Sequence, residues 1–160
     1  MNVSVGEVSE SDSAFDAVCE LFDDYRAHYG QLRSPREVRA WLGQQSASGN
    51  LRVMAATIDG LPRGFVTTTA SPASLSLGTA LLVRDLWVDP SHRRHGLARQ
   101  LLSEVIRVGR AAGARRVALQ TEVDNAPALA LYENLGFQRT VGLEHLGMDL
   151  MGTSTAATGP

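Results

Sequence analysis

The 160-residue sequence contains no lysine and only one cysteine, Cys19. All 15 basic residues are arginine, so no lysine side chain is available for acylation. The single cysteine excludes an internal disulfide and a cysteine-based zinc site, and it suits a reducing compartment. The four histidines are scattered, without the spacing of metal ligands. We therefore expect no metal site.

A strong charge of either sign and a long apolar run are also missing. The net charge of −2 gives no general attraction to nucleic acid or to an acidic membrane, so any phosphate must be bound locally. The longest apolar run is far too short to cross a bilayer. Met1 leads into a polar, alternating segment rather than a signal peptide. These absences favour a cytoplasmic protein that binds neither nucleic acid nor membrane.

Hydrophobic periodicity predicts an α/β domain with a mixed sheet. Period-two segments predict strands at 2–8, 77–88 and 117–123, a hairpin over 51–71, and a final strand or pair of strands over 137–150. Helical spacing predicts helices over 9–30, 34–49, 96–112 and 125–137. The order predicts a central mixed sheet of six to seven strands flanked by about four helices. We expect one domain over residues 1–150 and a disordered tail over 151–160.

The stretch "DPSHRRHGLARQLL" (89–102) joins a predicted strand to the start of an amphipathic helix. A helix N-terminus offers backbone N–H groups without intrahelical partners, and its dipole favours an anion. Gly96 allows a close backbone approach, Ala98 keeps the next position small, and the nearby arginines can pair with phosphate oxygens. The turn is suited to a diphosphate held mainly by backbone amides. The alternative is a solvated basic loop that happens to contain a glycine.

Two better-known phosphate motifs do not fit this turn. A P-loop would carry Gly-Lys followed by Ser or Thr, and the chain has no lysine. A dinucleotide-binding fingerprint needs more glycines than the single Gly96. It also needs an acidic residue about twenty positions further on, after a second strand, and this sequence has none there.

A second motif follows in "NAPALALYENLGF" (125–137), where Asn125 opens a helix, Tyr132 lies further along it and Gly136-Phe137 end it. Together with the R-x-x-G-x-A pattern of Arg93 to Ala98 after a strand ending "LWVDP", this resembles the GCN5-related N-acetyltransferase superfamily. The resemblance covers residues 75–150 well. It implies the fold of that superfamily, and acetyl-coenzyme A (acetyl-CoA) as the cosubstrate.

The resemblance also assigns residues to the coenzyme. It gives the diphosphate to the turn Arg93, Arg94, His95, Gly96, Leu97, Ala98 and Arg99, and the pantetheine arm to the strand residues Leu86, Trp87 and Val88. Asn125 would contact the pantetheine or its neighbouring backbone. Tyr132 would lie near the coenzyme sulfur and protonate the departing thiolate. Without the resemblance, Asn125 is interpreted as a helix N-cap, and Tyr132 is interpreted as a core residue whose hydroxyl group reaches solvent.

The implied chemistry is a direct attack of a neutral primary amine on the thioester, without an acyl-enzyme. The Val88 N–H would stabilise the oxyanion, and a base must first remove a proton from the amine. Asp85 is the first candidate base and Glu122 the second; Asp85 could instead pair with an arginine on the sheet surface. An acidic acceptor pocket would favour a polycationic acceptor. The side chains that could form such a pocket are Asp23, Asp24, Asp85, Glu122 and Glu144.

The acceptor itself is left open, as a small-molecule amine or a peptide amine. Two other functions remain. One is a non-catalytic acyl-coenzyme A sensor, which would have little use for an acid at the sulfur. The other is an acetyltransferase of protein N-termini or of charged tRNA, whose tRNA version the net charge of −2 disfavours. Members of the superfamily often dimerise, so the resemblance leaves both a monomer and a homodimer open, and the sequence itself shows no clear interface.

Overall fold

The computed structural model describes residues 1–152, and of the predicted disordered tail only Met151 and Gly152 lie within that range. The chain forms two compact units, Met1–Leu119 and a second that begins at Gln120. None of the helices in the described range combines the length and the apolar character needed to cross a membrane.

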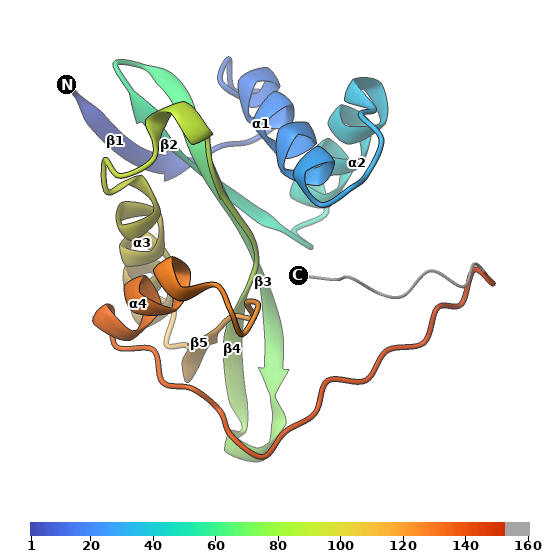
Figure 1. Cartoon of the computed structure of the whole chain (residues 1–160), viewed down its shortest axis with the longest axis vertical. Coiled ribbons are helices and arrows are strands. Elements are labelled where there is room, and N and C mark those ends of the chain that lie inside the picture. Colours follow the sequence, from blue (N-terminus) through green and yellow to red (C-terminus); the bar gives the residue numbers. More distant parts are fainter. Residues whose placement is uncertain (153–160) are drawn as a thin grey trace. The chain divides into compact units, whose positions relative to one another are not determined.

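A five-stranded mixed sheet forms the centre of the first unit (Figure 1). Its strands are β1 (Val3–Glu7), β2 (Arg52–Ile58), β3 (Leu61–Ala73), β4 (Gly78–Val88) and β5 (Arg116–Ala118). They lie in chain order; β1 to β4 pair antiparallel, and β5 pairs parallel to β4. The prediction of a mixed α/β sheet is therefore confirmed.

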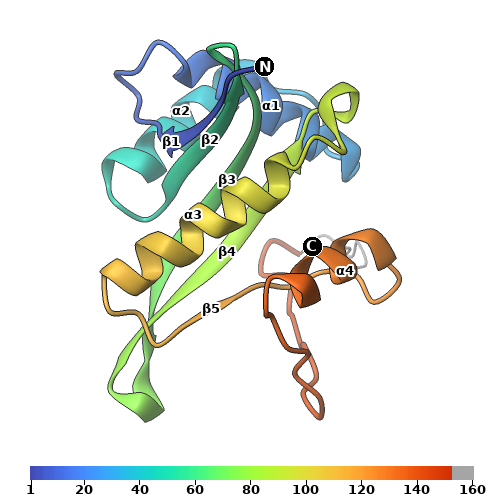
Figure 2. The same cartoon turned by 90° about the vertical axis from the view of Figure 1, so that its left-hand side faces the viewer.

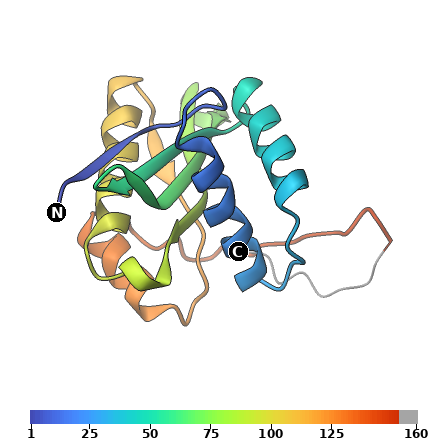
Figure 3. The ribbon, with the colours of Figure 1, turned by 90° about the horizontal axis from the view of Figure 1, so that it is seen from above.

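Helices cover both faces of this sheet. Helices α1 (Phe15–His28) and α2 (Pro35–Ala47) lie on one face, and α3 (Leu97–Ala111) crosses the other (Figures 2 and 3). The core is correspondingly split: Phe65 and Trp87 pack under α1 and α2, whereas Met54 and Val66 pack under α3. Two short 3-10 turns, η1 (Ser74–Ser76) and η2 (Pro90–His92), follow β3 and β4. The fourth helix, α4 (Ala126–Asn134), belongs to the second unit.

The strand count was predicted too high. Residues 1–152 contain five strands rather than six to seven, and no strand forms over 137–150. Gly142, at φ +83°, interrupts the period-two pattern there, and Val141 and Leu143 are exposed. Strand β5 is three residues long, shorter than the predicted 117–123. An alternating sequence is a strand only where a neighbouring backbone completes its hydrogen bonds.

Strand β3 is longer than predicted. The hairpin was predicted to end at residue 71, yet Ser71–Ala73 all belong to β3. These three residues pair with Gly78–Ala80 of β4. The β3–β4 ribbon is therefore long, and it carries the groups described below.

The amphipathic stripe of α3 provides a stability test. Leu101 is fully buried, whereas Leu75 on η1 is fully exposed. We expect Leu101→Ala to lower the free energy of unfolding by about 2–5 kcal/mol, because the lost side chain leaves a cavity in the core. Leu75→Ala, the matched control, should change it by less than about 0.5 kcal/mol. Urea unfolding followed by circular dichroism measures both, and equal effects would contradict this assignment of the core.

Candidate functional site

The backbone of the turn between β4 and α3 is shaped to bind an anion. Arg94 has φ +64° and Gly96 has φ +76°, so two residues out of three adopt the left-handed conformation. Alternation of this kind points successive N–H groups toward one concavity. Gly96 is the N-cap of α3, and glycine has no side-chain oxygen to cap the first-turn amides. The turn and the helix start therefore present donors to a ligand.

Asp89 holds the entry to this turn. Its carboxylate accepts hydrogen bonds from the Ser91 N–H at 3.0 Å and from His92 Nδ1 at 3.1 Å, and Arg63 lies 3.8 Å away. Although partial burial opposes it, hydrogen bonding to Ser91 and His92 lowers the pKa of Asp89 below its ordinary value. The carboxylate is therefore charged at neutral pH and fixes the turn before any ligand arrives.

Arg93 ties the turn to the end of β4. Its guanidinium lies 4.8 Å from the centroid of the Trp87 ring, and its Nε donates to the Val88 carbonyl at 3.2 Å. The side chains of Arg94, His95 and Arg99 are exposed. His95 Nδ1 lies 3.1 Å from the His92 carbonyl oxygen. The turn is thus positively charged and anchored at its first arginine.

One edge of β4 is open beyond Leu82. Strand β5 pairs with β4 only over Ala80–Leu82, and no other strand of the described chain takes its place further along. On the opposite edge β3 pairs with β4 as far as Val88, and the Asp89 N–H donates to the Arg63 carbonyl at 2.8 Å. The open edge lies next to the anion-binding turn in sequence.

The register fixes which main-chain groups face this open edge. Hydrogen-bonded and non-bonded pairs alternate along an antiparallel ladder. Since Asp89 bonds to Arg63, the next bonded pair is Trp87 with Phe65. The N–H and C=O groups of Leu86 and Val88 therefore point away from β3, toward the open edge. The main chain of Trp87 points toward β3, and its side chain is buried under α1.

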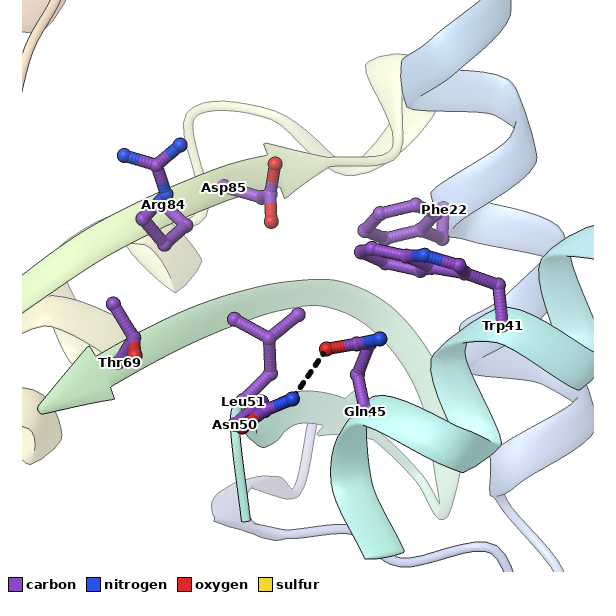
Figure 4. A pocket seen from close by; sticks show the side chains of 8 residues that line it. All are labelled: Phe22, Trp41, Gln45, Asn50, Leu51, Thr69, Arg84 and Asp85. Carbon is purple, nitrogen blue, oxygen red and sulfur yellow. Dashed lines mark hydrogen bonds between the residues drawn. The ribbon is translucent and has the colours of Figure 1, made fainter. Parts of the chain in front are cut away.

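A β-bulge interrupts β4 just before this segment. Thr67 of β3 pairs with Asp85, but the next residue, Thr68, pairs with Val83. Arg84 is therefore the extra residue, opposite no partner. Because of the bulge, two consecutive side chains of β4, Arg84 and Asp85, line the same pocket (Figure 4).

The pocket has a volume of about 400 Å³ and lies between the sheet and the first two helices. Its lining residues are Phe22, Trp41, Gln45, Asn50, Leu51, Thr69, Arg84 and Asp85. The rings of Phe22 and Trp41 are 6.0 Å apart, and Asn50 Nδ2 donates to Gln45 Oε1 at 3.1 Å (Figure 4). The walls thus combine aromatic rings, an amide pair and two opposite charges.

Two hydroxyl groups hold Asp85. Thr67 donates to its carboxylate from β3, and the Tyr25 hydroxyl hydrogen-bonds to it from α1. Burial, together with the charge of Asp85, raises the pKa of Tyr25 far above its ordinary value. Tyr25 is therefore protonated at neutral pH and acts as a donor. A carboxylate has about four acceptor sites, so Asp85 can still bind a ligand in the pocket.

Of the five acidic side chains that the sequence suggests for an acceptor pocket, only Asp85 lines the pocket of the first unit. Asp23 pairs with Arg26 at 2.8 Å and accepts from the Ser34 N–H at 3.0 Å, and Asp24 pairs with Arg33. Neither lines the pocket. Glu122 and Glu144 belong to the second unit. Within residues 1–152, no group of three or more His, Cys, Asp or Glu side chains is arranged to hold a metal ion.

The second unit holds the other residues assigned from the sequence. Asn125 caps α4, because its Oδ1 accepts from the Ala128 N–H at 3.3 Å. Glu122 accepts from the Thr121 hydroxyl at 3.4 Å. The N-cap interpretation of Asn125 is therefore confirmed, and its role toward a ligand stays a prediction.

The end of α4 explains the sequence "LGF" after Tyr132. Gly136 has φ +100° and donates to the Glu133 carbonyl, and the Phe137 N–H donates to the Tyr132 carbonyl, both at 3.0 Å. This is a Schellman motif, in which an apolar contact closes the helix end. The rings of Tyr132 and Phe137 make that contact, with centroids 6.0 Å apart. Tyr132 is thereby fixed on α4.

The chain is similar in sequence and in fold to known proteins. A family model described as the Acetyltransferase (GNAT) family matches residues 15–137. YhfO of Bacillus subtilis, described as an uncharacterized N-acetyltransferase, is 29% identical over 143 residues, covering 89% of this chain and 95% of YhfO. The N-alpha-acetyltransferase RimI of Mycobacterium tuberculosis is 43% identical over 61 residues, 38% of this chain and 36% of RimI. A crystal structure of a probable acetyltransferase aligns with a TM-score of 0.82 and 26% identity, over 94% of this chain and 98% of that one.

Proposed function

From the premise that the chain belongs to the acetyltransferase (GNAT) family and is an acetyl-CoA-dependent N-acetyltransferase, we propose that it acetylates a primary amine held in the Asp85 pocket. One observation carries this proposal. The pocket lies at the bulge of β4, immediately before the segment whose main chain faces the open edge. A single strand can therefore present the amine and the thioester to each other, which is the proximity that the reaction needs.

The donor side fits coenzyme A on two grounds. The turn over 93–96 concentrates N–H donors and positive charge, as a diphosphate requires. The N–H and C=O groups of Leu86 and the C=O group of Val88 can pair with the amide groups of an extended pantetheine arm, as a neighbouring strand would. Bound along this path, acetyl-CoA supplies the acetyl thioester.

We assign the catalytic roles to three groups of this chain, of which Asp85 and Tyr132 transfer protons. Asp85 accepts a proton from the ammonium form of the amine, directly or through a water molecule. The Val88 N–H donates toward the carbonyl oxygen that gains negative charge. Tyr132 gives its proton to the departing thiolate. Glu122 is the second candidate for the base, and Asn125 would contact the pantetheine from the N-terminus of α4.

Further properties follow as parts of the same proposal. The family match over 15–137 extends into both compact units, which supports a single acetyltransferase domain over 1–150. The composition favours the cytoplasm, and both oligomeric states, monomer and homodimer, stay open. A sensor without turnover is disfavoured by a pocket that carries a carboxylate.

Thiol release from acetyl-CoA, measured with a panel of primary amines, tests the proposed activity. The absence of thiol release with every amine of the panel would overturn it.

We expect Gly96→Glu to weaken coenzyme A binding by at least about 100-fold, because it places a negative charge where the diphosphate would lie. Gly113→Glu is the matched control. Gly113 lies beyond the other end of α3 with φ +72°, and an added Cβ meets nothing within 4 Å at either position. The backbone strain is therefore similar, while the charge is remote from the turn. Calorimetric titration with coenzyme A measures both, and equal affinities would remove the turn from the donor site.

A further inference from the structure

The pocket at the β-bulge carries a cation and an anion on adjacent residues. From this juxtaposition we propose that the acceptor is a zwitterion: a free amino acid with an apolar side chain, whose ammonium group binds Asp85 and whose carboxylate binds Arg84. The inference rests on the proposed function and adds the substrate class to it.

The bulge is what makes this pairing possible. Along a regular strand, consecutive side chains point to opposite faces of the sheet. In a regular β4, a charge next to Asp85 would therefore lie on the face that α3 covers. Because Arg84 is the inserted residue, it lines the same pocket as Asp85. The bulge therefore places a positive and a negative side chain on adjacent residues at one wall of the pocket, where the carboxylate and the ammonium of one amino acid can each meet the opposite charge.

Both charges are available to a ligand. Arg84 is exposed, and within residues 1–152 it forms no salt bridge, with Asp85 or with any other acid. Its positive charge acts on the Tyr25 hydroxyl, where it opposes the rise in the pKa of Tyr25 that burial and Asp85 cause. The side chain of Arg84 lines the same pocket as that of Asp85 (Figure 4). A guanidinium binds a carboxylate through two parallel hydrogen bonds, which orients as well as attracts it.

The remaining walls select against a second charge on the acceptor. Phe22, Trp41 and Leu51 give the pocket an apolar side, while Gln45 and Asn50 bond to each other. Asp85 is the only acid among the lining residues. A polyamine would bring further cations that find no carboxylate there. An aromatic or aliphatic side chain, in contrast, can pack against the rings of Phe22 and Trp41.

The experiment compares pairs of acceptors that differ only in the carboxylate. Thiol release from acetyl-CoA is measured with phenylalanine, tryptophan and leucine, and with the corresponding amines phenethylamine, tryptamine and isoamylamine. Each acceptor is tested with the unmodified protein, with Arg84→Gln and with Arg84→Lys. The exposed Arg110 provides a control, Arg110→Gln, which removes an arginine of α3 away from the pocket.

We expect Arg84→Gln to reduce kcat/KM by about 10- to 100-fold more for an amino acid than for its matching amine, because only the former loses a charge-assisted hydrogen bond. Comparing the two losses cancels the different basicities of the acceptors. Arg84→Lys keeps the positive charge but cannot form two parallel hydrogen bonds with a carboxylate. Its kcat/KM for the amino acids should therefore lie between those of Arg84→Gln and the unmodified protein. Arg110→Gln should change neither value.

Two results would overturn the inference while the proposed function stands. One is an equal loss for amino acid and amine in Arg84→Gln. The other is turnover of phenylalaninamide or of a peptide amine as fast as that of phenylalanine, which would assign the pocket to peptide N-termini. Thiol release with no amine of any kind, although acetyl-CoA binds, would overturn the proposed function together with the inference.

Discussion

Asp85→Asn should lower kcat for amine acetylation by about 100- to 10,000-fold, the range that a positioned general base contributes. An asparagine keeps the shape of the side chain and can still accept from the Thr67 and Tyr25 hydroxyls, which hold the carboxylate now. It cannot take a proton from the ammonium group. The loss should shrink as the pH rises toward the pKa of the amine itself, because more of the acceptor is then neutral before it binds.

Glu122→Gln is the control for this prediction, since Glu122 is the second candidate base. Initial rates at saturating acetyl-CoA, measured over a range of pH, give kcat and KM for both variants. A thermal melt checks that Asp85→Asn is folded. If Glu122→Gln showed the large, pH-dependent loss and Asp85→Asn did not, the base would be Glu122 and Asp85 would only bind the acceptor.

Tyr132→Phe should lower kcat on the order of 100-fold while the affinity for coenzyme A stays nearly unchanged. The substitution removes only the hydroxyl group. The ring that closes the end of α4 against Phe137 is retained, so the helix and its Schellman motif should persist. A loss confined to kcat is the signature of a group that acts only in the transition state.

Single-turnover rates separate this effect from product release, and calorimetry gives the affinity. Glu133→Gln, next to Tyr132 on the exposed side of α4, is a suitable control with no expected change in kcat. Equal rates in Tyr132→Phe and in the unmodified protein would remove Tyr132 from the mechanism and leave it a packing residue of α4.

The parts of the site that the sequence predicted are those set by local signals. A strand, a glycine-containing turn and an amphipathic helix are readable from neighbouring residues, and α3 begins one residue after Gly96 as the stripe indicates. The N-cap at Asn125 is local in the same sense. Left-handed backbone at Arg94 was not predicted, because arginine has no preference for it; the turn imposes it.

The acceptor side could not be predicted because it depends on pairing between distant residues. The bulge at Arg84 exists only relative to the register of β3, and a period-two pattern does not show where an extra residue is inserted. Similarly, the sequence counts Asp23 and Asp24 as charges but cannot show that Arg26 and Arg33 pair with them. The predicted strands over 137–150 failed for the related reason that a strand needs a partner.

The most direct test of where the two substrates bind is an amide-resolved NMR titration of the protein with coenzyme A. We expect saturable shifts of the backbone N–H signals of Leu86, Val88 and residues 94–98, since these groups would bind the pantetheine and the diphosphate. A later addition of phenylalanine should shift the signals of Arg84 and Asp85. Saturable shifts confined to other segments would contradict the assignment of β4 and the turn that follows it as the coenzyme-binding site of this acetyltransferase. The absence of any shift at millimolar coenzyme A would contradict it as well.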